Sequence, residues 1–310
     1  MADCRISDPA DFGRVALLVG GESAEREVSL DGGECVAGAL KRRGVRFEVY
    51  DGTPDLFDAI LARRIDRVFN LMHGPGGEDG AIQGALQLMK VPVTGSGVLG
   101  SALSMDKVRS KWVLERLAIR TAPFERTGAR DDDAARIIER FGLPLFVKPA
   151  GLGSSIGVSR VERAEELPAA IELAAGYGEE VIVEPGIEGD EYFAGILGRT
   201  PLPLIRIETP RAFYDYEAKY HSDDTRYFCP AGLEPALEQR LQSEALAAFD
   251  ALGAAGWGRV DFILDGQQRA WFLEVNTAPG MTDHSLVPQA AAAIGVDFDE
   301  LVWRILETSL

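Results

Sequence analysis

The sequence GWGRVDFILDGQQRAWFLEVN, residues 256–276, predicts two adjacent strands that decide the architecture of the C-terminal half. Polar and apolar residues alternate on both sides of Asp265-Gly266, a pair that is typical of a hairpin turn. Side chains two residues apart share one face of a strand, which brings four polar residues together: Arg259, Asp261, Glu274 and Asn276. The apolar residues between them are expected to face a core: Val260, Phe262, Leu273 and Val275.

This polar face has the chemistry of a magnesium site. Carboxylate and amide oxygens beside a guanidinium suit magnesium that holds a polyphosphate, and they do not suit zinc. The alternative is a solvent-facing surface whose charges pair across the strands. Four such groups in alternation, followed by a Gly/Pro loop after Asn276, favour a functional site.

A glycine-rich segment precedes this hairpin. Residues 148–157, KPAGLGSSIG, follow an apolar strand, and their backbone N–H groups could approach phosphates without obstruction by side chains. Lys148 would add a positive charge. The segment is not a Walker A loop, and a flexible hairpin tip with a solvent-directed lysine is an equal alternative.

The first hundred residues predict a small doubly wound parallel α/β domain. Strands at 15–19, 45–50 and 68–72 alternate with helices at 23–40 and 81–89. A ligand site is expected beyond the carboxyl ends of such strands. Glu25 and His73 fall there, although a carboxylate at a helix start commonly complements the helix dipole and a lone turn histidine is commonly structural.

The pattern changes after residue 105, where strand–turn–strand order predicts an antiparallel α+β arrangement. Strands are expected near 145–148, 157–161, 180–184 and 191–197. Residues 211–230 form a polar, tyrosine-rich stretch that is too long for an ordinary connection, which favours a functional lid. Helices are expected at 106–117, at 234–252 and from residue 285 onward.

Composition argues against several classes of function. The chain has 310 residues, with 32 Lys and Arg against 49 Asp and Glu, and a net charge of −17 makes nucleic acid an unfavourable partner. Three separated cysteines suggest neither a disulfide framework nor a zinc site. A polar N-terminal segment and the lack of an apolar run of about 18 residues predict a cytoplasmic protein without a membrane partner.

Five segments together resemble the D-alanine–D-alanine ligases of the ATP-grasp superfamily. They are residues 20–30, 73–84, 94–111, 213–220 and the two strands of the hairpin with the following loop, 256–265 and 272–288. The resemblance implies an N-terminal α/β domain (1–105) followed by a two-subdomain ATP-grasp fold, namely a central subdomain (106–186) and a C-terminal subdomain (187–310) with a lid at 211–230. It also implies a homodimer.

The resemblance assigns nucleotide and metal ligands. ATP would lie between the two ATP-grasp subdomains and contact five residues: Lys107, Lys148, Ser155, Glu184 and Glu191. Lys107 and Lys148 resemble the lysines that contact phosphates, Glu184 the acid that binds the adenine amino group, and Glu191 the acid that holds the ribose. Two Mg²⁺ ions, replaceable by Mn²⁺, would be held by residues of the hairpin face: Asp261, Glu274 and Asn276.

The resemblance also implies catalytic and substrate-binding residues. Glu25 would bind the ammonium of the first D-alanine and join Ser154 and Tyr220 in a hydrogen-bonded triad. Lys219 would reach the transferred phosphate, and Arg259 with the Gly280 amide would stabilise the oxyanion. The remaining residues expected to contact substrate are His73 and Ser285, the latter through the carboxylate of the second D-alanine.

The implied reaction joins two D-alanines through a D-alanyl phosphate and supplies peptidoglycan precursors. Tyr220 is typical of the members that form a dipeptide, whereas histidine is found there in relatives that form D-alanyl-D-lactate. The alternatives within enzymes are that D-lactate ligase or another ATP-grasp carboxylate–amine ligase. A nucleotide-binding protein without catalysis is the alternative from another class.

Overall fold

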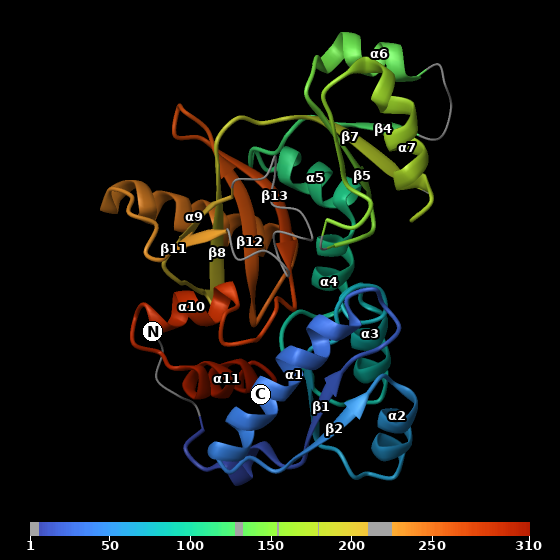
Figure 1. The fold of residues 1–310 in the computed structure, drawn as a ribbon. Coiled ribbons are helices and arrows are strands. Elements are labelled where there is room, and N and C mark those ends of the chain that lie inside the picture. The colour runs from blue at the N-terminus through green and yellow to red at the C-terminus, as the bar shows by residue number, and fades with distance from the viewer. Residues whose placement is uncertain (1–5, 128–132, 154, 179, 210–224) are drawn as a thin grey trace.

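Three β-sheets organise the chain in the computed structural model, which describes residues 6–127, 133–153, 155–178, 180–209 and 225–310 (Figure 1). The first sheet is parallel, in the order β2-β1-β3. Its strands and the surrounding helices are β1 (Val15–Val19), β2 (Phe47–Asp51), β3 (Arg67–Asn70), η1 (Pro9–Phe12), α1 (Arg26–Arg42), α2 (Pro54–Leu61) and α3 (Ala81–Leu88).

Strand β1 is buried on both faces, as the unbroken apolar run predicts. Leu17 and Val19 pack in one apolar cluster with Val36 of α1. Ala16 and Leu18 pack in a second cluster with residues of α2 and α3. Helices therefore cover both faces of this sheet, which confirms the predicted doubly wound arrangement.

The second sheet is antiparallel, in the order β4-β7-β5-β6. Its strands and helices are β4 (Glu125–Thr127), β5 (Leu145–Pro149), β6 (Ser159–Val161), β7 (Val181–Pro185), α6 (Asp133–Phe141), η2 (Ala164–Glu166) and α7 (Leu167–Ala175). Leu145 and Val147 pack toward α6 and α7, together with Val183 of β7. Because side chains alternate along a strand, Phe146 and Lys148 lie on the opposite face.

The third sheet carries the predicted hairpin and has the order β11-β10-β8-β12-β13, with β9 paired to β8. Its strands are β8 (Asp190–Leu197), β9 (Thr200–Pro201), β10 (Ile205–Glu208), β11 (Arg226–Phe228), β12 (Trp257–Leu264) and β13 (Ala270–Asn276). Helix α9 (Pro235–Ala251) contributes Leu241 and Phe249 to a core that also contains Val260 and Phe262 of β12.

The hairpin has the predicted register at its polar residues. Arg259 lies opposite Asn276, and Asp261 lies opposite Glu274. The prediction for Leu273 is wrong, because the register shifts beyond Asp261 and Phe272 takes the core position opposite Phe262. This β-bulge turns Leu273 away from the core. The connection is also longer than the predicted two-residue turn and spans residues 265–269.

Several other elements differ from the expected ones. The helix expected at 106–117 is α5 (Lys107–Arg116), and a separate helix, α4 (Val98–Met105), precedes it. Asp106 divides the two helices because its backbone is extended and its carboxylate accepts a hydrogen bond from the Arg109 N–H. Most of the expected lid, 211–224, lies outside the described residues, and the last part of it contains β11 instead of an irregular loop.

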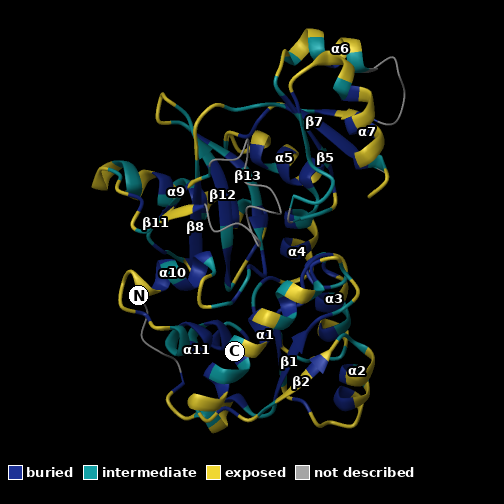
Figure 2. Cartoon of the chain, in the orientation of Figure 1, coloured by how far each residue is buried: buried dark blue, intermediate teal, exposed yellow. Residues whose placement is uncertain are grey.

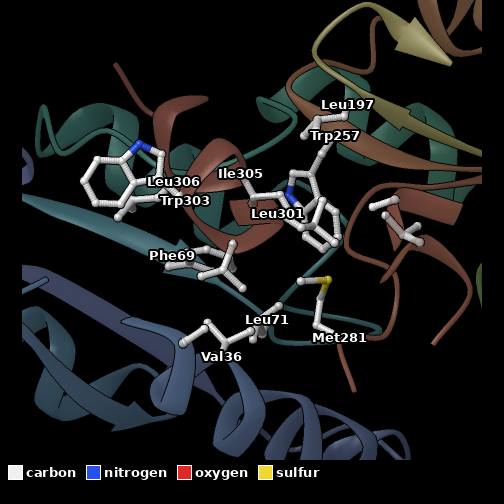
Figure 3. Packing of buried hydrophobic residues seen from close by; sticks show 14 of the residues in the cluster. Val36, Phe69, Leu71, Leu197, Trp257, Met281, Leu301, Trp303, Ile305 and Leu306 are labelled. Carbon is white, nitrogen blue, oxygen red and sulfur yellow. The ribbon is translucent and has the colours of Figure 1, made fainter. Parts of the chain in front are cut away.

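The C-terminal helices join the first and third sheets. They are α10 (Leu286–Ala292) and α11 (Phe298–Glu307), and α11 lies beside α1 (Figure 1). The apolar side chains of α10 and α11 pack in one cluster with residues of both sheets. Within this cluster, Trp303 and Leu306 lie near Phe69 (Figure 3). The Glu307 carboxylate accepts a hydrogen bond of 2.9 Å from the Ile6 N–H. Figure 2 shows that these helices are buried where they face the rest of the molecule.

No helix within the described ranges has both the length and the apolar content needed to cross a bilayer.

Candidate active site

A cleft of about 830 Å³, open to solvent, contains residues of both antiparallel sheets. All five residues expected to contact ATP line it: Lys107, Lys148, Ser155, Glu184 and Glu191. Two of the expected metal ligands, Asp261 and Glu274, line the same cleft. Its apolar lining includes Phe146 from β5, Ile187 from the segment after β7, and Ile263 and Leu273 from the hairpin. Such a mixed lining suits a planar base next to a charged group.

Glu184 lies buried at the base of this cleft between two lysines. The Lys148 ammonium donates to Glu184 Oε2 at 2.7 Å, and Lys111 Nζ lies 2.6 Å from Glu184 Oε1. Burial by itself would raise the pKa of Glu184, but the charges of Lys111 and Lys148 outweigh it and lower the pKa to about 2. The carboxylate therefore stays ionised.

Lys107 connects the glycine-rich loop to the hairpin. Its ammonium donates to the Leu152 carbonyl at 2.5 Å and lies 3.2 Å from Glu274 Oε2. Its backbone N–H donates to the Ala150 carbonyl at 2.9 Å. Lys107 begins α5, so the helix holds one end of the 148–157 loop against the cleft.

The polar face of the hairpin is confirmed as a cluster of charge. Arg259 donates to both oxygens of Asp261 at 2.7 Å, and its guanidinium lies 5.2 Å from the centre of the Phe193 ring. Asp261 is only 2 % exposed. Such a bidentate pair keeps a buried carboxylate ionised and fixes its orientation.

The oxygen set of this face fits magnesium. The Asn276 Oδ1 atom is buried and has no hydrogen-bond partner within the described part of the chain, as expected of an oxygen that binds a cation. No three acidic, His or Cys side chains among the described residues group closely enough to bind a metal by themselves. Magnesium is commonly bound by one or two carboxylates together with substrate phosphates, so Asp261, Glu274 and Asn276 match that mode.

A second cavity of about 380 Å³ adjoins the first. Lys107 and Glu274 line both cavities, and the second one also reaches Glu25 and Asn276. Glu25 precedes α1 and is 7 % exposed, and its carboxylate makes no capping hydrogen bond to that helix. The expected substrate carboxylate and the expected metal ligands therefore line two adjoining cavities that share Lys107 and Glu274.

Glu78 lines this second cavity, and His73 Nδ1 lies 3.9 Å from Glu78 Oε2. The Glu78 carboxylate accepts hydrogen bonds from the Gly74 N–H (2.8 Å) and, across the molecule, from the Ala278 N–H (3.1 Å). Burial and then the Glu25 charge raise the pKa of Glu78 to about 8. Burial is also the main reason why the pKa of His73 falls to about 4. His73 is thus neutral at physiological pH.

Gly280 and Ser285 belong to the loop that follows the hairpin. A Cβ atom on Gly280 would lie 3.2 Å from Ser285 Oγ, so the two residues adjoin. The Ser285 hydroxyl accepts from the Thr282 N–H at 3.0 Å and is also 2.9 Å from Thr282 Oγ1. This turn holds the Ser285 hydroxyl in place at the start of α10.

Three of the expected catalytic residues, Ser154, Lys219 and Tyr220, lie outside the described residues. Sequence reasoning missed two buried groups that the structure places here, Glu78 and Lys111. Lys111 follows Lys107 by one helical turn, a spacing that puts both on one side of α5 and could have indicated a shared environment. Glu78 lies in the glycine-rich turn after His73, where its acidic side chain was the available signal.

Comparisons with known proteins agree with this geometry. Family profiles described as D-ala D-ala ligase N-terminus and D-ala D-ala ligase C-terminus match residues 51–96 and 98–307. The D-alanine–D-alanine ligase of Methylococcus capsulatus is 54 % identical over 305 residues, which cover 98 % of each chain.

Two solved structures have the same architecture. The Bacillus anthracis D-alanine–D-alanine ligase complexed with ATP has a TM-score of 0.82 and 30 % identity, over 96 % of this chain and 97 % of that one. The D-Ala:D-Ser ligase VanG of Enterococcus faecalis has a TM-score of 0.81 and 30 % identity, over 96 % and 99 %. The fold is thus that of the ATP-grasp ligases, and the chain belongs to the D-alanine–D-alanine ligase family.

Proposed function

We propose that the protein joins two D-alanines to D-alanyl-D-alanine, with conversion of ATP to ADP and phosphate, for peptidoglycan precursor synthesis. The observation that carries this proposal is that the two cavities adjoin and share Lys107 and Glu274 in their linings. One cavity has lysines and apolar walls suited to a nucleotide. The other has Glu25, a buried carboxylate suited to a substrate ammonium.

The nucleotide is expected to lie with its base among the apolar residues of the cleft and its phosphates toward the hairpin. Lys148 and Lys107 would neutralise phosphate charge, and the Ser155 end of the glycine-rich loop would supply further donors. Glu184 and Glu191 would bind the adenine amino group and the ribose. The side chains of Pro185 and Ile187 also line the cleft beside Glu184, which supports an apolar adenine site there.

We infer that Asp261, Glu274 and Asn276 hold two Mg²⁺ ions, with Mn²⁺ as a functional substitute. Bound magnesium would neutralise charge on the phosphoryl group that is transferred to the first D-alanine carboxylate. Arg259 keeps Asp261 oriented for this role through its two hydrogen bonds. The unpartnered Oδ1 of Asn276, within the described residues, supports the same assignment.

The proposed chemistry has two steps, acyl phosphate formation and attack by the amine of the second D-alanine. Glu25 would anchor the first ammonium, with Ser154 and Tyr220, and Lys219 would stabilise the transferred phosphoryl group. Arg259 and the Gly280 N–H would donate to the oxyanion of the tetrahedral intermediate. Ser285 would bind the second carboxylate, and His73, neutral because it is buried, would contribute to the substrate site.

We also propose that the chain forms three domains, with boundaries after residues 105 and 186. Each proposed domain contains one of the three sheets, which supports it. We further propose that the protein acts as a homodimer and works in the cytoplasm, where ATP is available.

The test is magnesium- and ATP-dependent phosphate release with D-alanine, with L-alanine, and with D-alanine plus D-lactate, followed by mass spectrometry. Product of D-alanyl-D-alanine mass with D-alanine, and none with L-alanine, is expected. A D-alanyl-D-lactate mass would identify the ester-forming alternative. Phosphate release without either product would identify another carboxylate–amine ligase, and ATP binding without release would identify a protein without catalysis.

A matched pair of variants tests the substrate anchor. Glu25→Gln removes the buried charge and is expected to raise the KM for D-alanine with little change in the KM for ATP. The control is Glu22→Gln, because Glu22 lies three residues away and is exposed. Equal kinetics of the two variants would contradict the role of Glu25.

A further inference from the structure

A third lysine, Lys111, lies behind the cleft and has no role in the proposed reaction. It is 2 % exposed, on α5, and it does not belong to the cleft lining formed by Lys107 and Lys148. Its ammonium donates to Thr121 Oγ1 at 2.7 Å and to the Ala122 carbonyl at 2.9 Å, in addition to its 2.6 Å contact with Glu184. The Thr121, Ala122 and Glu184 oxygens thus surround the ammonium, so Lys111 is directed away from the cleft.

Lys111 acts on the cleft through Glu184. Glu184 is only 2 % exposed, and its two oxygens are divided between Lys111 on the inner side and Lys148 on the cleft side. The terminal torsion of a glutamate is soft, so a carboxylate held at one oxygen alone can rotate. The contact with Lys111 fixes that rotation and thereby the direction in which Glu184 presents its second oxygen.

A second set of contacts runs from Lys111 to the hairpin. Thr121 Oγ1 donates to the Phe272 carbonyl at 2.8 Å, and the Phe272 N–H donates to the Arg120 carbonyl at 2.9 Å. Phe272 immediately precedes the bulged Leu273 and the proposed metal ligand Glu274. Lys111 therefore connects the wall of the cleft formed by β7 to the wall formed by β13.

The charges explain why a lysine stands at this buried position. Burial lowers the pKa of Lys111, and the nearby Glu184 opposes that shift. Lys148 alone would hold only Oε2 of Glu184, whereas Lys111 faces Oε1 directly behind the proposed phosphate-binding lysine. A buried charged group is costly unless it is paired, so the position of Glu184 depends on both lysines.

We propose that Lys111 is a positioning residue for the nucleotide: it orients Glu184, which in turn fixes the Lys148 ammonium at the cleft wall. This inference rests on the proposed function of the cleft as the ATP site. It implies that Lys111 controls the affinity for ATP without contacting it and has little influence on the affinity for D-alanine.

The experiment compares Lys111→Met, Glu184→Gln and the double variant with the wild-type protein. ATP and magnesium are titrated into each protein by calorimetry without D-alanine, and the KM for each substrate is measured separately. Lys111→Met should weaken ATP binding by about tenfold, the usual scale for loss of a residue that orients a ligand-binding group. Its KM for D-alanine should stay near the wild-type value.

The double variant separates positioning from a general structural effect. Because Lys111 acts through Glu184, Lys111→Met should cause no further loss of ATP affinity in the Glu184→Gln background. Lys148 still neutralises Glu184 in Lys111→Met, so the variant is expected to fold. If it does not, Lys111→Gln keeps donors for Thr121 and Ala122 but lacks the charge, and the same expectations apply to it.

The control is Lys41→Met, which removes an exposed lysine of α1 and should bind ATP as the wild type does. Wild-type affinity in Lys111→Met would overturn the proposal, as would equal weakening for both substrates or additive losses in the double variant. If the wild-type protein binds ATP but forms no D-alanyl-D-alanine, the proposed function fails, whereas the binding comparison still decides the role of Lys111.

Discussion

Arg259 combines two tasks that a mutation would disturb together. Its guanidinium is proposed to stabilise the oxyanion, and it is also the bidentate partner of the buried Asp261. Arg259→Ala should lower kcat by about 100-fold or more, the scale observed when one preorganised oxyanion donor is lost. Steady-state phosphate release at saturating ATP and D-alanine measures this effect.

The same hairpin provides a matched control for Arg259. Arg269 also pairs with an aspartate, Asp265, at 2.7 Å, but Asp265 lines neither of the two cavities of the site, whereas Asp261, the partner of Arg259, lines the cleft. Arg269→Ala should therefore retain near wild-type kcat. Comparable turnover in both variants would show that Arg259 does not act on the transition state.

His73 predicts a specific dependence of stability on pH. Its folded pKa of about 4 lies below the ordinary value of 6.5, so between these values the unfolded chain binds more protons than the folded one. Stability from His73 is thus complete above pH 6.5 and is lost as the pH falls toward 4. The loss amounts to about 3 kcal/mol, from roughly 1.4 kcal/mol per pKa unit.

The measurement compares wild type with His73→Gln by denaturant unfolding at pH 7 and at pH 4. The raised pKa of Glu78 gives a contribution of opposite sign between about pH 4.5 and 8, and it is present in both proteins. The difference in unfolding free energy between wild type and His73→Gln should therefore change between pH 7 and pH 4 by the contribution of His73 alone, about 3 kcal/mol. A difference that is independent of pH would show that His73 has an ordinary pKa.

At the scale of elements, helix α4 approaches the loop after α9 at a glycine. A Cβ atom on Gly100 would lie 2.3 Å from the Gly253 carbonyl oxygen, a backbone atom that cannot easily move. Gly100→Ala should destabilise the protein by about 1–3 kcal/mol, although alanine favours a helix. The change in thermal midpoint measures it.

Gly84 in α3 is the control for this close approach. Its Cβ atom would meet only the Val98 side chain, at an ordinary 3.7 Å. Gly84→Ala should raise stability by about 0.5–1 kcal/mol, because alanine lowers the entropy of the unfolded chain. Destabilisation by both substitutions would mean that helix packing, rather than the contact with Gly253, determines the result.

The elements that the sequence predicts well are those with a local signal. Alternation of polar and apolar residues predicted the hairpin and the facing of Asp261 and Glu274, and the buried run 15–19 predicted the parallel sheet. The bulge at Leu273 was not predictable, because it depends on pairing with the partner strand. Glu78 was missed for a similar reason, since its partner Ala278 is 200 residues away in the sequence.

At the scale of the whole molecule, α11 stabilises the joint between the N-terminal sheet and the rest. Trp303 is 5 % exposed, packs edge-on against Phe12 with ring centres 4.8 Å apart, and lies in the shared cluster. Trp303→Ala should cost about 3–5 kcal/mol. Trp112→Ala, at a site 46 % exposed on α5, should cost far less, and denaturant midpoints of the two variants provide the comparison. Similar midpoints would contradict the role of α11.

The contrast between the lysine-lined cleft and the acidic chain has a consequence for encounter kinetics. The two lysines that line the cleft, Lys107 and Lys148, belong to a protein with a net charge of −17. An incoming nucleotide anion is repelled at long range, and only the short-range contacts with these two lysines attract it. Raising the ionic strength from about 0.01 to 0.15 M shortens the Debye length from roughly 30 to 8 Å, so added salt should accelerate ATP association in stopped-flow mixing. Screening of this repulsion would then make ATP association faster at physiological salt than in dilute buffer.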